Sequence, residues 1–142
     1  MQKSFINPAN IAPPVSQYTH VVRVEGRDLA WIFVSGQVPL DPQGSLVGAG
    51  DMGQQAERIF EELRIALEAA GATLHDVVKT TFYTTDMSCY DQVVAVRNRY
   101  FDAIHPPAST NVEVRRLVQE KWLLEIEATA VVAVSAKGID TP

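Results

Sequence analysis

The sequence predicts an α+β fold in which two helices cover one face of a β-sheet. Residues 51–71 carry apolar side chains at three- and four-residue steps, and residues 90–104 return to the same spacing. The other apolar segments are short and rich in β-branched and aromatic residues, which is typical of strands. The predicted order is therefore ββαβαββ, and the length fits one domain over residues 1–142.

The first half of the chain divides into an arm, a hairpin, a loop and a long helix. Residues 1–16 contain three prolines and predict an extended N-terminal arm. The hairpin has strands over residues 21–24 and 31–35, and a loop rich in proline and glycine follows it. Asp51 is the predicted N-cap of the helix, and Gly71 stands where a left-handed C-cap belongs. The expected buried stripe of this helix is Ala56, Ile59, Phe60, Leu63, Ala66, Leu67 and Ala70.

The second half predicts a strand, a helix and a final pair of strands. The first strand covers residues 77–85, and the helix over residues 90–104 has to end before Pro106. The last two strands cover residues 109–118 and 123–134.

The segment "QEKW" between the last two strands predicts a turn that pairs them side by side. This pairing brings Arg115 opposite Glu125 and Glu113 opposite Glu127. Residues 135–142 are the expected C-terminal tail.

The last strand has two different faces, because successive side chains of a strand point to opposite sides of the sheet. Its even positions, from Leu124 to Val134, are apolar and predict the face that the helices cover. Its odd positions mix glutamates with apolar residues. Because helices cover only one side, this half-apolar face predicts burial against another subunit, and we expect a homo-oligomer. The alternative is an exposed face with weak ion pairs.

Composition excludes several classes of protein. The net charge is −5, and the twelve lysines and arginines are scattered, which argues against nucleic acid as the main partner. The single cysteine, Cys89, suits a reducing compartment, and no apolar run approaches the about 20 residues of a membrane span, so we expect a cytoplasmic protein. The three histidines lie far apart, which predicts no metal site, and no phosphate-binding glycine motif is present.

Glu125 is a candidate catalytic residue. On a face that association would bury, a carboxylate has to be paired or have a raised pKa, and a raised pKa suits a general acid or base. The alternative is a structural ion pair with Arg115. The segment "SGQ" puts Ser35 and Gly36 at a strand-to-loop junction, where glycine exposes backbone N–H groups to a ligand or serves only as a turn residue. The segment "HPPAST" and the next residue offer hydroxyl and amide groups without a charge: Ser109, Thr110 and Asn111.

Four segments together resemble the Rid family, the reactive intermediate deaminases or YjgF-like proteins. They are "SGQVPLDPQG", "EAAGATLHDVVKTTFYTTDM", "HPPAST" and "LLEIEATAVV", and the resemblance spans roughly residues 15–134. It implies a chorismate-mutase-like α+β sandwich that forms a homotrimer, with ligand clefts between subunits. Family members hydrolyse reactive enamines and imines to 2-oxo acids and ammonia, and they need no metal or cofactor.

The resemblance assigns roles position by position. Tyr18 matches the cleft tyrosine of the family, and Gly36 matches a glycine whose backbone lines the pocket. Glu125 matches the glutamate that holds the hydrolytic water, and Asn111 stands where a backbone N–H meets the substrate. The family motif "PARS" reads "PAST" here, so Ser109 replaces an arginine that binds the substrate carboxylate. Loss of such a bidentate anchor typically costs about 2–5 kcal/mol of binding, which puts the usual imino-acid substrate in doubt.

Three functions remain open from the sequence. The first is an enzyme that hydrolyses an imine, an enamine or a related C–N bond, with Glu125 positioning water and an altered substrate read by Ser109, Thr110 and Asn111. The second is a non-catalytic trimer that binds a small molecule or a partner. The third, an endoribonuclease or translation inhibitor, fits the acidic charge balance least well.

Overall fold

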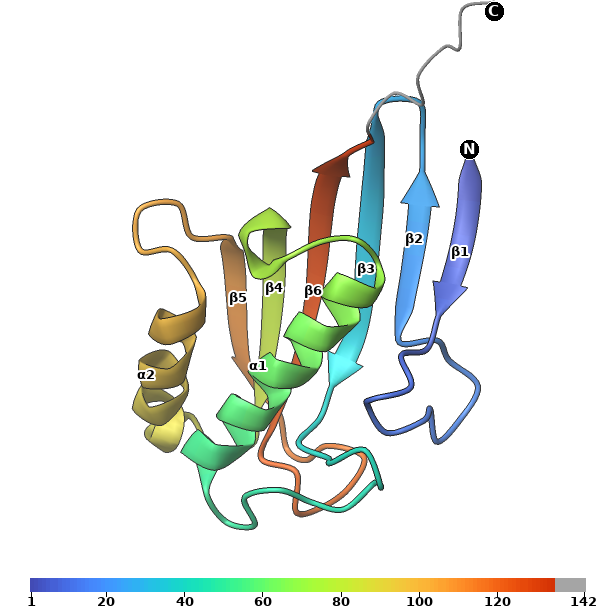
Figure 1. Ribbon diagram of the computed structural model, residues 1–142. Helices are drawn as coiled ribbons and strands as arrows, with labels where there is room; N and C mark the ends of the chain where they lie inside the picture. The colour runs from blue at the N-terminus through green and yellow to red at the C-terminus, as the bar shows by residue number, and fades with distance from the viewer. Residues whose placement is uncertain (135–142) are drawn as a thin grey trace, which may run out of the picture.

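The computed structural model describes residues 1–134, and it shows two helices packed on one face of a six-stranded mixed sheet (Figure 1). The strands lie in the order β1-β2-β3-β6-β4-β5. The elements are β1 (Gln2–Ile6), β2 (Val21–Glu25), β3 (Leu29–Gln37), α1 (Met52–Ala69), β4 (Val77–Thr84), α2 (Tyr90–Tyr100), β5 (Ala108–Glu113) and β6 (Leu124–Ala133). Short 3-10 turns, Leu74–Asp76 and Met87–Cys89, precede β4 and α2 respectively.

Helix α1 forms as its sequence predicts. The Asp51 side chain accepts a hydrogen bond from the Gln54 backbone N–H at 2.9 Å, which caps the N-terminus. Gly71 has φ 76°, and its N–H donates to the Glu68 carbonyl, while the N–H of Ala72 donates to the Leu67 carbonyl. These two bonds form a Schellman motif, which needs a left-handed residue at the position of Gly71. All seven residues of the predicted stripe are buried.

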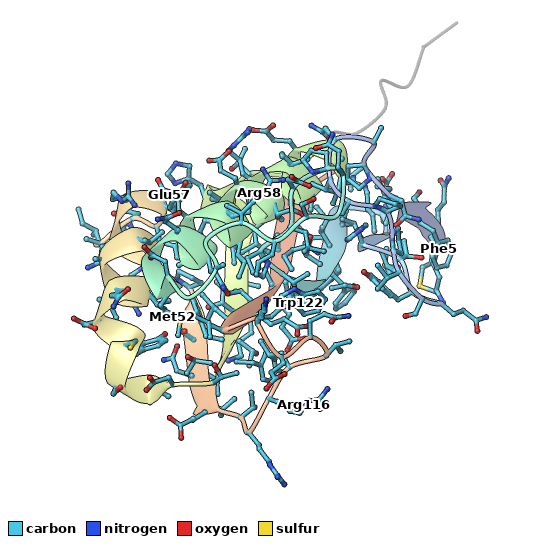
Figure 2. The ribbon with its side chains drawn as sticks, turned by 90° about the horizontal axis from the view of Figure 1, so that it is seen from below. Phe5, Met52, Glu57, Arg58, Arg116 and Trp122 are labelled. Carbon is cyan, nitrogen blue, oxygen red and sulfur yellow. The ribbon has the colours of Figure 1, made fainter. Side chains whose placement is uncertain are left out.

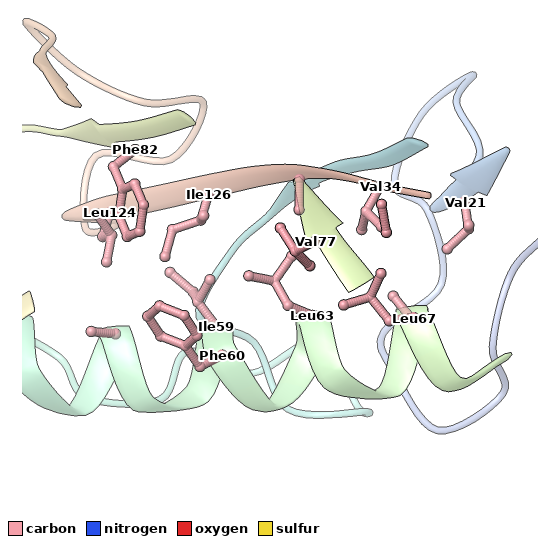
Figure 3. Close-up of a cluster of buried hydrophobic side chains, with 14 of the residues drawn as sticks. Val21, Val34, Ile59, Phe60, Leu63, Leu67, Val77, Phe82, Leu124 and Ile126 are labelled. Atoms are coloured by element: carbon pink, nitrogen blue, oxygen red, sulfur yellow. The ribbon is translucent and has the colours of Figure 1, made fainter. Parts of the chain in front are cut away.

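The main core lies between α1 and the sheet (Figure 3). Ile59, Phe60 and Leu63 of α1 pack beneath Phe82 of β4 and Ile126 of β6, and all five are fully buried. The even positions of β6 from residue 124 to 130 are buried, as the alternation predicts. The sheet therefore has one face sealed by helices and one face that no element of residues 1–134 covers.

The predicted pairing of the last two strands is wrong. β6 lies between β3 and β4, antiparallel to both, while β5 pairs in parallel with β4 at the edge of the sheet. Tyr83 and Thr81 of β4 therefore stand opposite Glu125 and Glu127. Arg115 lies beyond the end of β5, because that strand stops at Glu113 and not at residue 118.

Residues 114–123 form a long connection and not a tight turn, and side chains of α1 explain its course. The buried amide of Gln55 accepts from the Leu123 N–H at 2.8 Å and donates to the Lys121 carbonyl at 3.0 Å. Trp122 is also buried, against Ala12 and Leu40. These contacts hold the connection against α1, so that the chain enters the centre of the sheet as β6.

Two boundaries also differ from the prediction. Residues 2–6 of the expected N-terminal arm form strand β1, which pairs antiparallel with β2 because its backbone completes an otherwise open edge. Helix α2 ends at Tyr100, and Phe101 is already extended with ψ 145°. The predicted tail, residues 135–142, lies outside the described residues.

The open face of the sheet carries large apolar side chains. Trp31 and Phe33 of β3 are 47% and 45% exposed, and Leu29 precedes them on the same face. Within residues 1–134, no helix is long and apolar enough to cross a membrane. The same part of the chain holds no group of three or more His, Cys, Asp or Glu side chains placed to bind a metal ion.

Candidate functional site

A cavity of about 610 Å³ lies where the end of β3 meets the start of β6. Four of the seven predicted site residues line it: Tyr18, Ser35, Gly36 and Glu125. Val118 and Trp122 of the long connection form another part of its wall, and Figure 2 shows Trp122 beside this part of the sheet. Residues that are about 100 positions apart in the chain thus meet in one cavity.

Glu125 lies directly against the backbone of Gly36. A Cβ atom on residue 36 would stand 1.9 Å from Oε1 of Glu125 and 2.7 Å from its Cδ, far inside van der Waals contact. Gly36 has no positive φ, so space and not backbone conformation requires glycine here. The missing side chain gives the carboxylate its position in the cavity.

The electrostatic setting of Glu125 suits a base. Burial, and secondly the charge of Glu127, raise the pKa of the Glu125 carboxyl above its ordinary value of 4.5. Within residues 1–134 neither Glu125 nor Arg115 takes part in an ion pair, so the structural ion pair considered from the sequence is absent. A half-buried carboxylate without a cation holds its protons more tightly than a surface carboxylate.

Tyr18 and Ser35 play different parts in the cavity wall. Burial raises the pKa of the Tyr18 phenol, and the charges of Glu125 and Glu62 add to this effect. The phenol therefore stays protonated and can donate a hydrogen bond into the cavity. The Ser35 hydroxyl donates to the Thr19 carbonyl at 2.6 Å, so it fastens the loop that carries Tyr18.

A buried polar network stands behind the cavity. His20 Nε2 lies 2.9 Å from the Ala12 carbonyl, and its Nδ1 lies 3.3 Å from Nε2 of Gln37. The neutral imidazole with its proton on Nε2 satisfies both contacts. Gln37 also donates to the Ser35 carbonyl at 2.8 Å. The network ties the N-terminal loop to the end of β3.

A second buried carboxylate, Glu62 of α1, lies next to this network. Glu62 is 3% exposed, shares a small hollow with Tyr18, His20 and Gln37, and pairs with Arg58. Burial raises the pKa of Glu62, and Arg58 opposes that rise. The guanidinium also donates to the Leu40 carbonyl at 2.6 Å and so fixes the loop after β3.

The sequence analysis did not identify this supporting network. One signal was available, because Glu62 follows Ile59 by three residues and precedes Ala66 by four, and so interrupts the apolar stripe of α1. His20 and Gln37 carried no comparable signal, since their partner groups come from loops.

The other three predicted site residues lie two strands away on β5, and all are exposed. Thr110 Oγ1 is 2.6 Å from Nζ of Lys79, and Asn111 Oδ1 accepts a hydrogen bond from the Tyr90 hydroxyl of α2. Ser109 lines a different cavity, on the helix side of the sheet. One subunit therefore does not bring them to Glu125, and their role in the same cleft stays a prediction.

Comparison with known proteins identifies the family. The family model described as "Endoribonuclease L-PSP" matches residues 9–132. A RutC family protein of Pyrococcus abyssi is 36% identical, over 92% of this chain and 98% of its own length. The structure of the Rid protein YyfA of Yersinia pestis superposes with a TM-score of 0.83 at 31% identity, over 92% of this chain and 100% of YyfA. The chain belongs to the Rid (endoribonuclease L-PSP) family.

Another Rid relative has a named activity. The 2-iminobutanoate/2-iminopropanoate deaminase of Salmonella typhimurium is 38% identical, over 76% of this chain and 85% of its own length. The family match confirms the resemblance inferred from the sequence motifs, and the superposition confirms the predicted Rid fold. The matched residues 9–132 include every predicted site residue, from Tyr18 to Glu125.

Proposed function

We propose that this Rid protein hydrolyses a small reactive imine or enamine, with Glu125 as the general base. The observation that supports the proposal is a half-buried carboxylate of raised pKa that faces a cavity of about 610 Å³ and has no cationic partner within residues 1–134. The printed activity of the Salmonella relative, an iminobutanoate and iminopropanoate deaminase, points to the same chemistry.

The proposed reaction adds one water molecule across a C=N bond. The Glu125 carboxylate accepts a proton from water while the water oxygen bonds to the imine carbon, and Glu125 then passes this proton to the nitrogen. The resulting carbinolamine breaks its C–N bond and releases ammonia and a carbonyl compound. A carboxylate with a raised pKa is a stronger base than a surface one, and the Tyr18 phenol is placed to donate a hydrogen bond to the reacting group.

The proposed assembly is a homotrimer with the cleft between neighbouring subunits. The exposed Trp31 and Phe33 of the open face support burial of that face by association. The neighbouring subunit would then bring its Ser109, Thr110 and Asn111 to the cavity of Glu125. We place the protein in a reducing, cytoplasmic setting, because Cys89 is its one cysteine.

The proposed substrate differs from a simple imino acid at its carboxylate. Ser109 stands where the family motif carries an arginine. A serine hydroxyl offers one neutral hydrogen bond, whereas a guanidinium offers two parallel charged ones. We therefore expect a substrate in which the group that replaces the carboxylate is uncharged or lies at another position.

The experiment follows ammonia release from enamines that a pyridoxal-phosphate lyase generates in situ from several amino acids. We expect the purified protein to accelerate release from at least one of them and the Glu125→Gln variant to lose this acceleration. Glu120→Gln, the same change at an exposed residue of the long connection, is the matched control and keeps full activity. If no enamine reacts faster with the protein than without it, the proposal fails.

A second candidate is a non-catalytic binding protein. It is favoured by the absence of the family arginine at Ser109 and by the Ser35 hydroxyl, which is already engaged with the Thr19 carbonyl. Binding of a small carbonyl compound that is equally strong in the wild type and in Glu125→Gln, without turnover in either, would support this candidate over the enzyme.

A third candidate, cleavage of RNA, comes from the name of the family model. The net charge of −5 opposes it, because binding of a phosphate backbone relies on clustered cations. Intact RNA after prolonged incubation with purified protein would dismiss this candidate.

A further inference from the structure

Strand β3 contains a β-bulge shortly before its end. After Val34 the register of β3 against β6 shifts, and Gln37 pairs with Ile126. Ser35 and Gly36 together therefore stand opposite a single residue of β6. Bulges are common next to active sites, where the extra residue turns a neighbouring group in a new direction.

The bulge reverses the faces of the sheet on which the next residues lie. Val34 is buried on the helix side, so strict alternation would place Gly36 on that side and Gln37 on the open face. Gln37 is instead 1% exposed and lines the small hollow that contains Glu62 of α1. Gly36 instead faces the Glu125 carboxylate. The contact between Gly36 and Glu125 therefore exists because of the bulge.

The buried amide of Gln37 holds the bulge in place. Its Nε2 donates to the Ser35 carbonyl at 2.8 Å, and this bond spans the bulge from one side of Gly36 to the other. The same Nε2 donates to Nδ1 of His20 at 3.3 Å. The N–H of Ser35 in turn donates to the His20 carbonyl at 2.9 Å. The bulge is therefore tied to the loop before β2 through the Gln37 side chain and through the backbone.

We propose that Gln37 is a positioning residue for Glu125. Its amide keeps the bulge in the conformation in which the Gly36 backbone lies against the Glu125 carboxylate. Gln37 does not line the cavity of about 610 Å³, so it acts through Gly36 and not on a substrate. A displacement of about 1 Å can lower the rate of an enzyme about a hundredfold. The expected effect on rate rests on the proposed hydrolysis, whereas the expected effect on the carboxylate does not.

The pKa of Glu125 reports the position of its carboxylate without any substrate. Burial is the main cause of its rise, and the titratable groups that face Glu125 are Glu127 of the same strand, Tyr83 opposite on β4, and Tyr18 of the loop before β2. A substitution of Gln37 changes none of these groups. If the bulge relaxes, the carboxylate moves toward water and its pKa falls toward the ordinary value.

The experiment measures the pKa of Glu125 by carbon-13 NMR titration of the full-length wild type and of Gln37→Met. Methionine matches glutamine in length but donates no hydrogen bond. We expect the pKa of Glu125 to fall toward 4.5 by about half a pH unit or more. The control is Arg23→Met, which removes buried hydrogen bonds to the Ala70 carbonyl and to Glu25 but lies outside the cavity, and it leaves this pKa unchanged. An unchanged pKa in Gln37→Met, or an equal fall in both variants, would overturn the proposal.

The enamine assay adds a kinetic measurement. We expect Gln37→Met to lower kcat at least tenfold and to change KM less than threefold, because Gln37 does not contact the substrate. Arg23→Met keeps the kcat of the wild type. If the wild type itself releases no ammonia, the proposed hydrolysis fails, and the NMR titration still decides the role of Gln37.

Gln37→Asn is the second variant if Gln37→Met does not fold. It keeps a buried amide, but the side chain is shorter by one methylene group and no longer reaches both of its partners. We expect the pKa of Glu125 to fall in this variant as well. A folded Gln37→Asn in which this pKa is unchanged would contradict the positioning role.

Discussion

At the scale of single residues, the position of the Glu125 carboxylate depends on the missing side chain of Gly36. We expect Gly36→Ala to push this carboxylate out of the cavity, because the new Cβ would lie 1.9 Å from Oε1. The end of a glutamate side chain moves easily, so stability should change by about 1 kcal/mol or less, while hydrolysis falls at least tenfold. Thermal unfolding and the enamine assay measure the two effects. A variant of full activity would show that Glu125 does not work from its observed position.

The raised pKa of Glu125 predicts a pH-dependent stability. A folded-state pKa above the unfolded value means that ionisation opposes folding, so the penalty is absent below the ordinary pKa of 4.5 and complete above the raised folded-state pKa. Glu125→Gln should therefore be more stable than the wild type at pH 8, and the difference should vanish at pH 4. Urea unfolding of both proteins at pH 8 and pH 4 tests the sign of this stability difference. A variant that is less stable at pH 8 would indicate an unrecognised cationic partner.

The sequence identified four residues of the Glu125 cavity but not the buried hydrogen-bond network behind them. Motif positions suffice for Gly36 and Glu125, because both lie in recognisable segments, whereas Tyr18 lies outside those segments and was assigned from the family resemblance alone. The hydrogen bonds of His20 and Gln37 join groups from separate loops, and no local pattern encodes such contacts.

At the scale of elements, two of the ion-pair systems of α1 are of unequal importance. Arg58 pairs with buried Glu62 and also donates to the Leu40 carbonyl, whereas Arg64 pairs with Glu61 and Glu68 at the surface. We expect Arg58→Met to cost about 3 kcal/mol of unfolding free energy, because it leaves a buried carboxylate without its partner. Arg64→Met should cost less than about 1 kcal/mol. Chemical denaturation of both variants checks the contrast, and equal losses would contradict it.

The types of most elements were predictable from the sequence, but strand β1 and the order of the strands in the sheet were not. The capping groups and apolar stripe of α1 are local signals, and each has the predicted role. The partner of β6 is a long-range choice, and the short segment "QEKW" suggested the wrong one. The amide of Gln55 and the ring of Trp122 decide the course of that connection from α1 and from a loop.

At the scale of the whole molecule, the open face of the sheet predicts association. Trp31→Glu together with Phe33→Glu should convert the proposed trimer to monomers, because charged side chains would have to be buried in the interface. Ile104→Glu is the matched control, since that side chain is 79% exposed on a loop. Analytical ultracentrifugation measures the mass of each. A monomeric wild-type protein would contradict the proposed assembly.

The central place of β6 in the sheet has a consequence for synthesis of the chain. Its neighbours β3 and β4 leave the ribosome first, and each keeps an unsatisfied edge until residues 124–133 insert between them. Glu125 lies on this same strand, so the nascent protein completes its sheet and places the Glu125 carboxylate in one step. We therefore expect chains that end before residue 124 to expose two open strand edges and to be prone to aggregate.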